Sequence, residues 1–244
     1  MHGEETVNLA VEAFMHNLDT CRLQLVSIGF AFVSQHHEAQ HDTLPDLLER
    51  LLPGAYVFGC SAQSILAGAT EVEEQPGLAL LAGKLPGVAL HPFSFEAGDI
   101  PAAEAPAENW HEHLGLAKER TRGIVLLGDP FTGEPETTIH GLDLAFPGCT
   151  KVGGIASGGN SPGACALFAG ERVQRSGTIG LAFEGDLALD SIVAQGCRPV
   201  GQPMFVTRCE GNLVAELDGK EPCSVSPPAP PAHQRRRCTS IVTS

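Results

Sequence analysis

Residues 52–62 read LPGAYVFGCSA and residues 146–156 read FPGCTKVGGIA. A Pro-Gly helix stop, a short strand and a run of small residues therefore occur twice, at an offset of 94 residues. GLALLAG (77–83) likewise aligns with ACALFAG (164–170), at an offset of 87. Self-similarity that keeps its order along the chain predicts an internal duplication of about a hundred residues.

The segments around both stretches follow the same order of elements. Helical spacing of apolar residues, capping residues and early prolines predict helices, and nearly continuous apolar runs predict strands that are covered on both faces. The expected helices are TVNLAVEAFMHNLD (6–19), 42–54, 110–119 and 136–148, and the buried strands are 23–33 and 123–129. The sequence predicts an α/β fold: a layered helix/sheet sandwich with mixed sheets and an internal α-β-α-β-turn-β-β duplication.

Composition and charge exclude several classes of partner. The chain has 244 residues and a formal net charge of −14, which disfavours nucleic acid and anionic membrane surfaces. No apolar run is long enough to cross a bilayer, and the acidic start MHGEE lacks the features of a signal or transit peptide. The eight cysteines form no C-x-x-C pair, which indicates a reducing compartment. We expect an intracellular protein, cytoplasmic or organellar, with a plastid included.

The stretch QHHEAQHD (35–42) contains the motif H-E-x-x-H, which holds zinc when it lies on a helix. Here the motif falls between an expected strand and a helix that begins near Pro45, and it has no apolar flank to pack on a core. We therefore interpret it as a solvated loop and expect no metal site. No G-K-[ST] or dinucleotide-type G-x-G-x-x-G motif is present, so we also expect no cofactor.

Two small-residue turns are the better candidates for a ligand site. Both are expected to follow equivalent strands, where backbone N–H groups beside glycine can approach a small molecule. The alternative is that these glycines only allow tight exits from the strands. The candidate residues are Gly59, Cys60 and Ser61 in the first turn and Gly153, Gly154, Ser157, Gly158, Gly159 and Asn160 in the second.

Two further polar residues have a functional and a structural interpretation. Asp129, at the end of a buried strand, either faces the ligand or organises the Asp-Pro turn. Cys60 could act as a nucleophile, but a packed or ligand-lining thiol is the stronger interpretation because reactive cysteines need an electropositive setting. We predict no catalytic residues.

The order of several motifs resembles the FIST domain, over about residues 7–220. They include FGCSAQS, GLALLAGKLPGVALHPF, GDPF, FPGCTKVGGIASGG and GTIGLAFEG. This family comprises sensory domains of bacterial signalling proteins, plant and algal proteins, and an F-box ubiquitin-ligase adaptor. The resemblance implies an α/β fold that binds small ligands, such as amino acids or related metabolites, without established catalytic residues.

The resemblance also divides the chain into expected segments. The tail is rich in Pro, Ser and Ala and contains a triple arginine, so it has too few large apolar residues to join a core and should be disordered. The segments are the first half of the N-terminal FIST domain (1–96), a linker (97–108), its second half (109–186), an incomplete start of the C-terminal FIST domain (187–220) and the tail (221–244).

Three functions follow from these patterns. The first is a non-catalytic sensory domain that binds an unidentified small molecule through the paired turns. The second is a protein-interaction module, such as a fragment of a ubiquitin-ligase substrate adaptor. The third is a thiol enzyme that uses Cys60. We expect a small-molecule ligand and allow for a protein partner.

Overall fold

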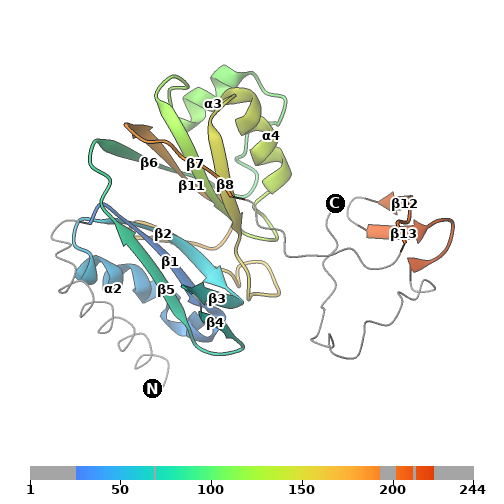
Figure 1. Cartoon of the computed structure of the whole chain (residues 1–244), viewed down its shortest axis with the longest axis horizontal. Helices are drawn as coiled ribbons and strands as arrows, with labels where there is room; N and C mark the ends of the chain where they lie inside the picture. The colour runs from blue at the N-terminus through green and yellow to red at the C-terminus, as the bar shows by residue number, and fades with distance from the viewer. Residues whose placement is uncertain (1–25, 69, 193–201, 211–212, 223–244) are drawn as a thin grey trace. The chain divides into compact units, whose positions relative to one another are not determined.

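The computed structural model describes residues 26–68, 70–192, 202–210 and 213–222. The chain divides into two units, Met1–Ser191 and Ile192–Ser244. The larger unit is an α/β sandwich in which two mixed sheets face each other and helices cover their outer faces (Figure 1). The expected helix at 6–19 lies outside the described residues.

The first sheet is built around a parallel pair, β1 and β2, that η1 (Gln35–Thr43) and α2 (Leu44–Leu51) connect. Pro45 lies in the first turn of α2, where a missing N–H costs nothing. In spatial order the strands are β10 (Arg172–Gln174), β9 (Leu167–Ala169), β2 (Tyr56–Ala62), β1 (Ile28–Ser34) and β5 (Leu78–Gly83).

The second sheet is built around another parallel pair, β7 and β8, that α4 (Pro135–Ala145) connects. The helix α3 (Ala107–Leu114) precedes β7 and packs beside α4. In spatial order the strands are β6 (Val88–Phe95), β11 (Thr178–Gly185), β7 (Thr121–Gly128) and β8 (Thr150–Ile155).

The two halves of the chain exchange strands. β6 comes from the first half but pairs with β11, and β9 comes from the second half but pairs with β2. The alignment at an offset of 94 places β2 over β8, and both strands lie parallel to the first strand of their sheet. The alignment of GLALLAG with ACALFAG is wrong, because β5 pairs with β1, whereas the strand that pairs with β7 in the same way is β11.

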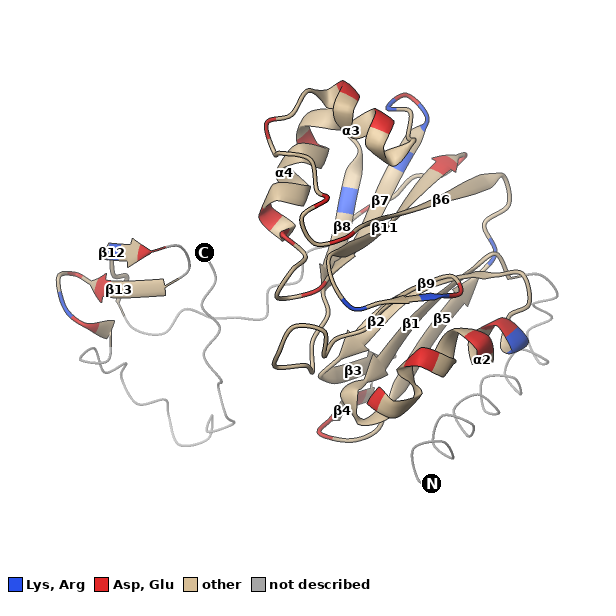
Figure 2. Ribbon diagram, turned by 180° about the vertical axis from the view of Figure 1, so that it is seen from behind, with Lys and Arg blue, Asp and Glu red and all other residues tan. Residues whose placement is uncertain are grey.

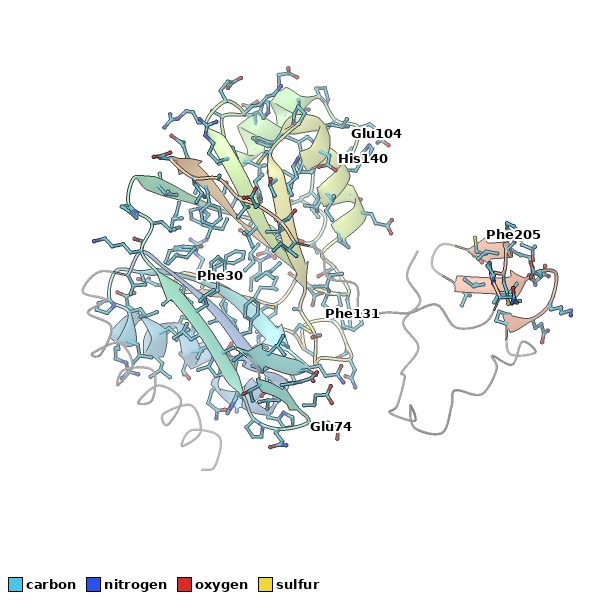
Figure 3. The ribbon with its side chains drawn as sticks, viewed as in Figure 1. Phe30, Glu74, Glu104, Phe131, His140 and Phe205 are labelled. Carbon is cyan, nitrogen blue, oxygen red and sulfur yellow. The ribbon has the colours of Figure 1, made fainter. Side chains whose placement is uncertain are left out.

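Apolar side chains fill three layers. The central core lies between the two sheets, and Phe30 of β1, labelled in Figure 3, contributes to it edge-on to Phe58. A second cluster lies under α2, and a third under α3 and α4. Their fully buried members include Phe58, Leu167 and Leu181 in the centre, Leu48 and Phe168 under α2, and Trp110 and Phe146 under α3 and α4.

The first residues of the two expected turns are parts of strands. β2 continues through Ala62 and β8 through Ile155, so Gly59, Cys60 and Ser61 and also Gly153 and Gly154 lie within strands. The reason is the parallel neighbour: β1 and β7 offer backbone partners along the full length of each strand. Ladder pairing outweighs the turn preference of the glycines. A hairpin that we did not predict follows β2; it consists of β3 (Ser64–Ala67) and β4 (Thr70–Glu73).

The QHHEAQHD segment is not a solvated loop. It forms the 3₁₀ helix η1, and His37 and His41 are buried with 1% and 0% of their surface exposed. The His41 ring packs edge-on against Phe168, with ring centroids 5.8 Å apart. Our interpretation was wrong because it counted the imidazoles as polar, whereas a neutral imidazole can be buried against a core.

The smaller unit contains one antiparallel hairpin among its described residues. It joins β12 (Val206–Glu210) to β13 (Leu213–Leu217). All but the first two residues of the tail at 221–244 lie outside the described residues.

Candidate functional site

Gly59 and Gly153 occupy matching positions in β2 and β8. Each lies opposite a residue of the parallel neighbour, Ala31 for Gly59 and Leu126 for Gly153. A Cβ atom at either glycine would overlap the carbonyl oxygen of that neighbour. Both glycines are therefore required by close backbone packing, whatever else they do.

The structure brings Ser61 and Ser157 together and joins the end of β2 to the loop after β8. The Ser157 N–H donates to the Ser61 carbonyl oxygen at 3.1 Å, and the Ser61 hydroxyl donates to the Ser157 carbonyl oxygen at 3.3 Å. The Ser61 Oγ also accepts from the Ala166 N–H at 3.0 Å. These polar groups hold the two sheets together at this end of the strands.

The remaining residues of the second turn differ from one another in packing. Gly158 has a φ of +96° and approaches Gln35 and Ala62, and Gly159 approaches Ala164. Asn160 is exposed. Gly154 faces open space, because nothing lies within 4 Å of a Cβ atom placed there.

Asp129 organises the loop between β7 and α4. Its Oδ2 accepts hydrogen bonds from the Phe131 N–H, the Thr132 N–H and the Thr132 hydroxyl at 3.1, 3.0 and 2.7 Å. The residue is 1% exposed, and its Oδ1 finds no hydrogen-bond partner among the described residues. The carboxylate thus has a structural role and keeps one buried oxygen unused.

Cys60 lies in the central core, and Cys165 belongs to the same cluster. Burial, with a smaller contribution from Cys165, raises the pKa of the Cys60 thiol to about 12. A thiol with this pKa stays protonated near neutral pH and is a poor nucleophile. The geometry therefore favours the packed-thiol interpretation over the thiol enzyme.

His37 and His41 are the buried histidines in the described part of the chain. Burial lowers the pKa of both rings, and for His41 the nearby Ser34 backbone opposes this lowering in part. Neither ring nitrogen of His37 has a hydrogen-bond partner of ordinary geometry in the described residues. Within those residues no cluster of three or more His, Cys, Asp or Glu side chains could hold a metal ion.

One cavity in the described part of the chain is lined by none of the residues predicted from the sequence. Its volume is about 570 Å³, and strands of both sheets line it, at the opposite end of β2 from Ser61. The lining residues are Pro45, Glu49, Gly54, Ala55, Tyr56, Val57, Pro92, Phe93, Ser94, Ala169, Gly170, Glu171 and Arg172.

Tyr56 gives this cavity its polar character together with charged side chains at the rim. Burial raises the pKa of Tyr56 to about 12, and nearby Arg172 opposes that rise. Glu171 and Arg172 are exposed, and Gly170, with a φ of +62°, packs closely on the Tyr56 ring. Tyr56 is the single tyrosine of the chain, which was an available signal. Nothing in the sequence indicated that β6 and β9 would meet it.

A smaller cavity of about 220 Å³ lies between β8 and α4. Gly153, Gly154 and Ile155 line it from the strand, and Pro135, Thr138 and Ile139 line it from the helix. Thr138 is 1% exposed, and its hydroxyl has no hydrogen-bond partner in the described part of the chain. Two of the predicted site residues, Gly153 and Gly154, thus border a cavity.

Fold and cavities define a two-sheet α/β domain with room for small molecules and without a recognisable catalytic constellation in the described residues. Residues 27–220 match the family model of the FIST N domain. The chain belongs to the FIST family, which is associated with signal transduction and small-ligand sensing. The match includes residues 187–220, whose assignment to a C-terminal FIST domain stays a prediction.

The similar proteins below are uncharacterised, so they do not indicate a function for this chain. The chain is 31% identical over 216 residues to an uncharacterised protein of Mycobacterium tuberculosis, with 87% of this chain and 54% of the relative covered. It is 31% identical over 214 residues to an uncharacterised protein of Mycobacterium bovis, with 87% and 53% covered. The chain thus spans about half the length of these relatives. No helix among the described residues is long and apolar enough to cross a membrane.

Proposed function

We propose that this chain is a sensory domain that binds a small molecule and catalyses no reaction. The observation that carries the proposal is the cavity of about 570 Å³ beside Tyr56. Ligand sites of proteins have volumes of roughly 300–1,000 Å³ and combine apolar walls with a few polar groups. FIST domains as a family are associated with small-ligand sensing.

The lining of the cavity suits a small molecule that carries both charges. Val57 and Phe93 supply apolar walls, the Tyr56 hydroxyl supplies a hydrogen-bonding group, and Arg172 and Glu171 stand at the rim with opposite charges. A guanidinium binds a carboxylate in a two-pronged geometry, and a carboxylate binds an ammonium group. Amino acids and related metabolites carry both groups, so we propose this class of ligand.

The paired segments around Ser61 and Ser157 stay a predicted ligand site. The cavity beside Tyr56 is the better candidate, because the side chains of these two serines are already hydrogen-bonded. The Ser61 and Ser157 side chains already bond to other parts of the protein. A polar group that is already satisfied gains little from a ligand. Among the described residues, by contrast, no hydrogen bond involves the side chain of Tyr56 or of Arg172.

Thermal unfolding against a panel of amino acids, organic acids and nucleotides tests the proposal. A ligand that binds only the native state stabilises it by about 2.7 kcal/mol at a hundredfold excess over its Kd. We expect one chemical class to raise the Tm, and we expect Arg172→Ala to abolish the shift. Arg122→Ala is the matched control, because Arg122 is exposed on β7 and does not line the cavity. A cooperative transition that no compound moves would contradict the proposal.

A further inference from the structure

The strand β8 has an open edge beside a cavity. It is the last strand of its sheet, and no strand of the described residues lies on its outer side. Unpaired N–H and C=O groups along such an edge can pair with another chain. Exposed Ile155 and Ile139, with 51% and 47% of their surface accessible, border the edge and the cavity.

One usual protection of an edge strand, a proline, is absent from β8. At the other edge of the same sheet, β6 carries Pro92, which cannot donate to a pairing strand. β8 reads TKVGGI and contains no proline. Its Lys151 does not guard the edge, because the Nζ donates to the Phe146 carbonyl oxygen at 2.7 Å and pairs with Asp143 at 2.9 Å.

The matching position in the first sheet shows how such an edge is filled. There β9 pairs antiparallel with β2, and Phe168 lies opposite Gly59. Residues that lie opposite each other in neighbouring strands point to the same face of the sheet. The Phe168 side chain accordingly packs under α2 and η1, where it is 1% exposed and contacts the His41 ring.

The second sheet has a corresponding space beside Gly153, but no side chain of the described residues occupies it as Phe168 does in the first sheet. Gly153 corresponds to Gly59, α4 corresponds to α2, and the space beside them is a cavity of about 220 Å³. A cavity of about 150 Å³ lined by apolar side chains already binds benzene. An added strand with an aromatic or large aliphatic residue opposite Gly153 would direct that side chain into the cavity.

We propose that β8 binds an extended peptide segment of a partner protein, which adds an antiparallel strand and inserts one large apolar side chain beside Gly153. Affinity would come from backbone pairing and specificity from the cavity, as in other cases of strand addition. This interaction is independent of the small-molecule cavity beside Tyr56, because the two cavities share no lining residue.

Charge indicates that the partner segment carries basic residues. Glu134 and Glu136 are exposed at the start of α4, and acidic residues lie along this helix (Figure 2). The whole chain has a net charge of −14. Pairing of β8 with β8 of a second copy would bring two acidic helices together, which costs free energy. A basic segment gains from the same charges.

The probe is a fluorescent peptide with the sequence of Gly163–Gly170, the segment that fills the first sheet. It carries Ser in place of Cys165 and two lysines at its end. We expect saturable binding to the full chain by fluorescence anisotropy, and we expect the peptide with Phe168→Asp to bind at least about tenfold more weakly, as for loss of a central anchor. Absence of saturable binding would overturn the proposal, and so would equal binding of both peptides.

Two variants of α4 form a matched pair. Ile139→Asp places a charge at the cavity, and Leu144→Asp places the same charge on the same helix outside the cavity; both side chains are about half exposed. We expect Ile139→Asp to raise the Kd of the peptide at least about tenfold and Leu144→Asp to leave it within about twofold. Equal effects of the two variants would overturn the proposal.

Two further measurements separate the alternatives. Arg172→Ala should leave peptide binding unchanged, so failure of the small-molecule proposal and failure of this one are distinguishable. Sedimentation equilibrium should show a monomer. A dimer that Ile139→Asp dissociates would overturn the proposal in favour of a second copy as the occupant.

Discussion

β2 and β8 present the same local geometry in two different surroundings. In each strand a glycine lies against a carbonyl oxygen of the parallel neighbour, and a helix covers the same face. β9 covers the free side of β2, and Phe168 fills the space under α2. No strand in the described part of the chain pairs with the free side of β8, and the space under α4 is a cavity.

The difference shows that the exchange of strands between the halves is unequal. The first half contributes β6 to the second sheet, but β6 pairs with β11 and leaves β8 at an edge. The second half contributes β9 and β10 to the first sheet, and β9 pairs with β2. One sheet thus fills the position beside its glycine with β9, whereas no strand of the described residues fills the corresponding position in the other sheet.

The largest expected effect on stability comes from removing the Phe168 ring, which fills the position beside Gly59. Phe168→Ala removes a fully buried ring between Gly59, His41 and Leu48. We expect the free energy of unfolding to fall by about 3–5 kcal/mol, the range for deletion of a buried aromatic ring. Urea unfolding measures it.

The open position supplies the control for that variant. Ile139→Ala removes a half-exposed side chain at the corresponding cavity of the second sheet. We expect a loss of about 1 kcal/mol or less, because little buried contact disappears. Equal losses in the two variants would mean that the two positions do not differ in packing as described.

A smaller effect is expected from pH, and it acts on the filled position alone. Burial lowers the pKa of His37 and His41 below 6.5, and the neighbouring charges His36, Glu38 and Arg175 modify it. The unfolded chain therefore binds more protons below pH 6.5. The free energy of unfolding should fall as the pH drops from 6.5 toward the folded pKa values and should not change from this cause above pH 6.5.

Urea unfolding between pH 7.5 and 4.5 checks this dependence. The double variant His37→Gln/His41→Gln should flatten it. His140→Gln should leave it unchanged, because His140 is exposed on α4 at the open position (Figure 3). An unaltered pH dependence in the double variant would show that these two rings are not its source.

The smallest expected effect is on stability in Gly154→Val. A Cβ atom at this position meets nothing within 4 Å, so we expect a change of about 0.5 kcal/mol or less. Because its stability should not change, the variant distinguishes a ligand site in the cavity beside Tyr56 from one at the segment around Gly154. Small-molecule binding should persist, as measured by the thermal shift, if the cavity beside Tyr56 binds the ligand. Loss of binding with unchanged stability would assign the ligand to the segment around Gly154.

Much of the fold could be predicted from the sequence, because apolar periodicity is a local property. The helix that begins near Pro45 and the buried strand at 123–129 both appear close to the expected bounds. The mixed α/β class is confirmed, and so is the family. The prediction that GCSAQS is a turn failed, because the pairing of Gly59 with Ala31 involves a strand that is distant in sequence.

The candidate site was less predictable. Both small-residue segments were predicted as candidates, and the structure joins Ser61 of the first to Ser157 of the second by hydrogen bonds. Tyr56 and Arg172 could not be paired from the sequence, because their neighbourhood depends on β9 crossing to the first sheet. His37 was misjudged for a similar reason: nothing in QHHEAQHD indicates which neighbours bury it.

The sequence by itself determined the order of helices and strands, the glycines at 59 and 153 and the acidic surface, since each depends on residue type and local spacing. Only the tertiary structure decided which strand lies beside each glycine. β2 and β8 present similar backbones and similar helices, and the local sequence does not say whether a third strand joins them. Pairing between distant strands depends on the path of the whole chain, and that path filled one position and left the other open.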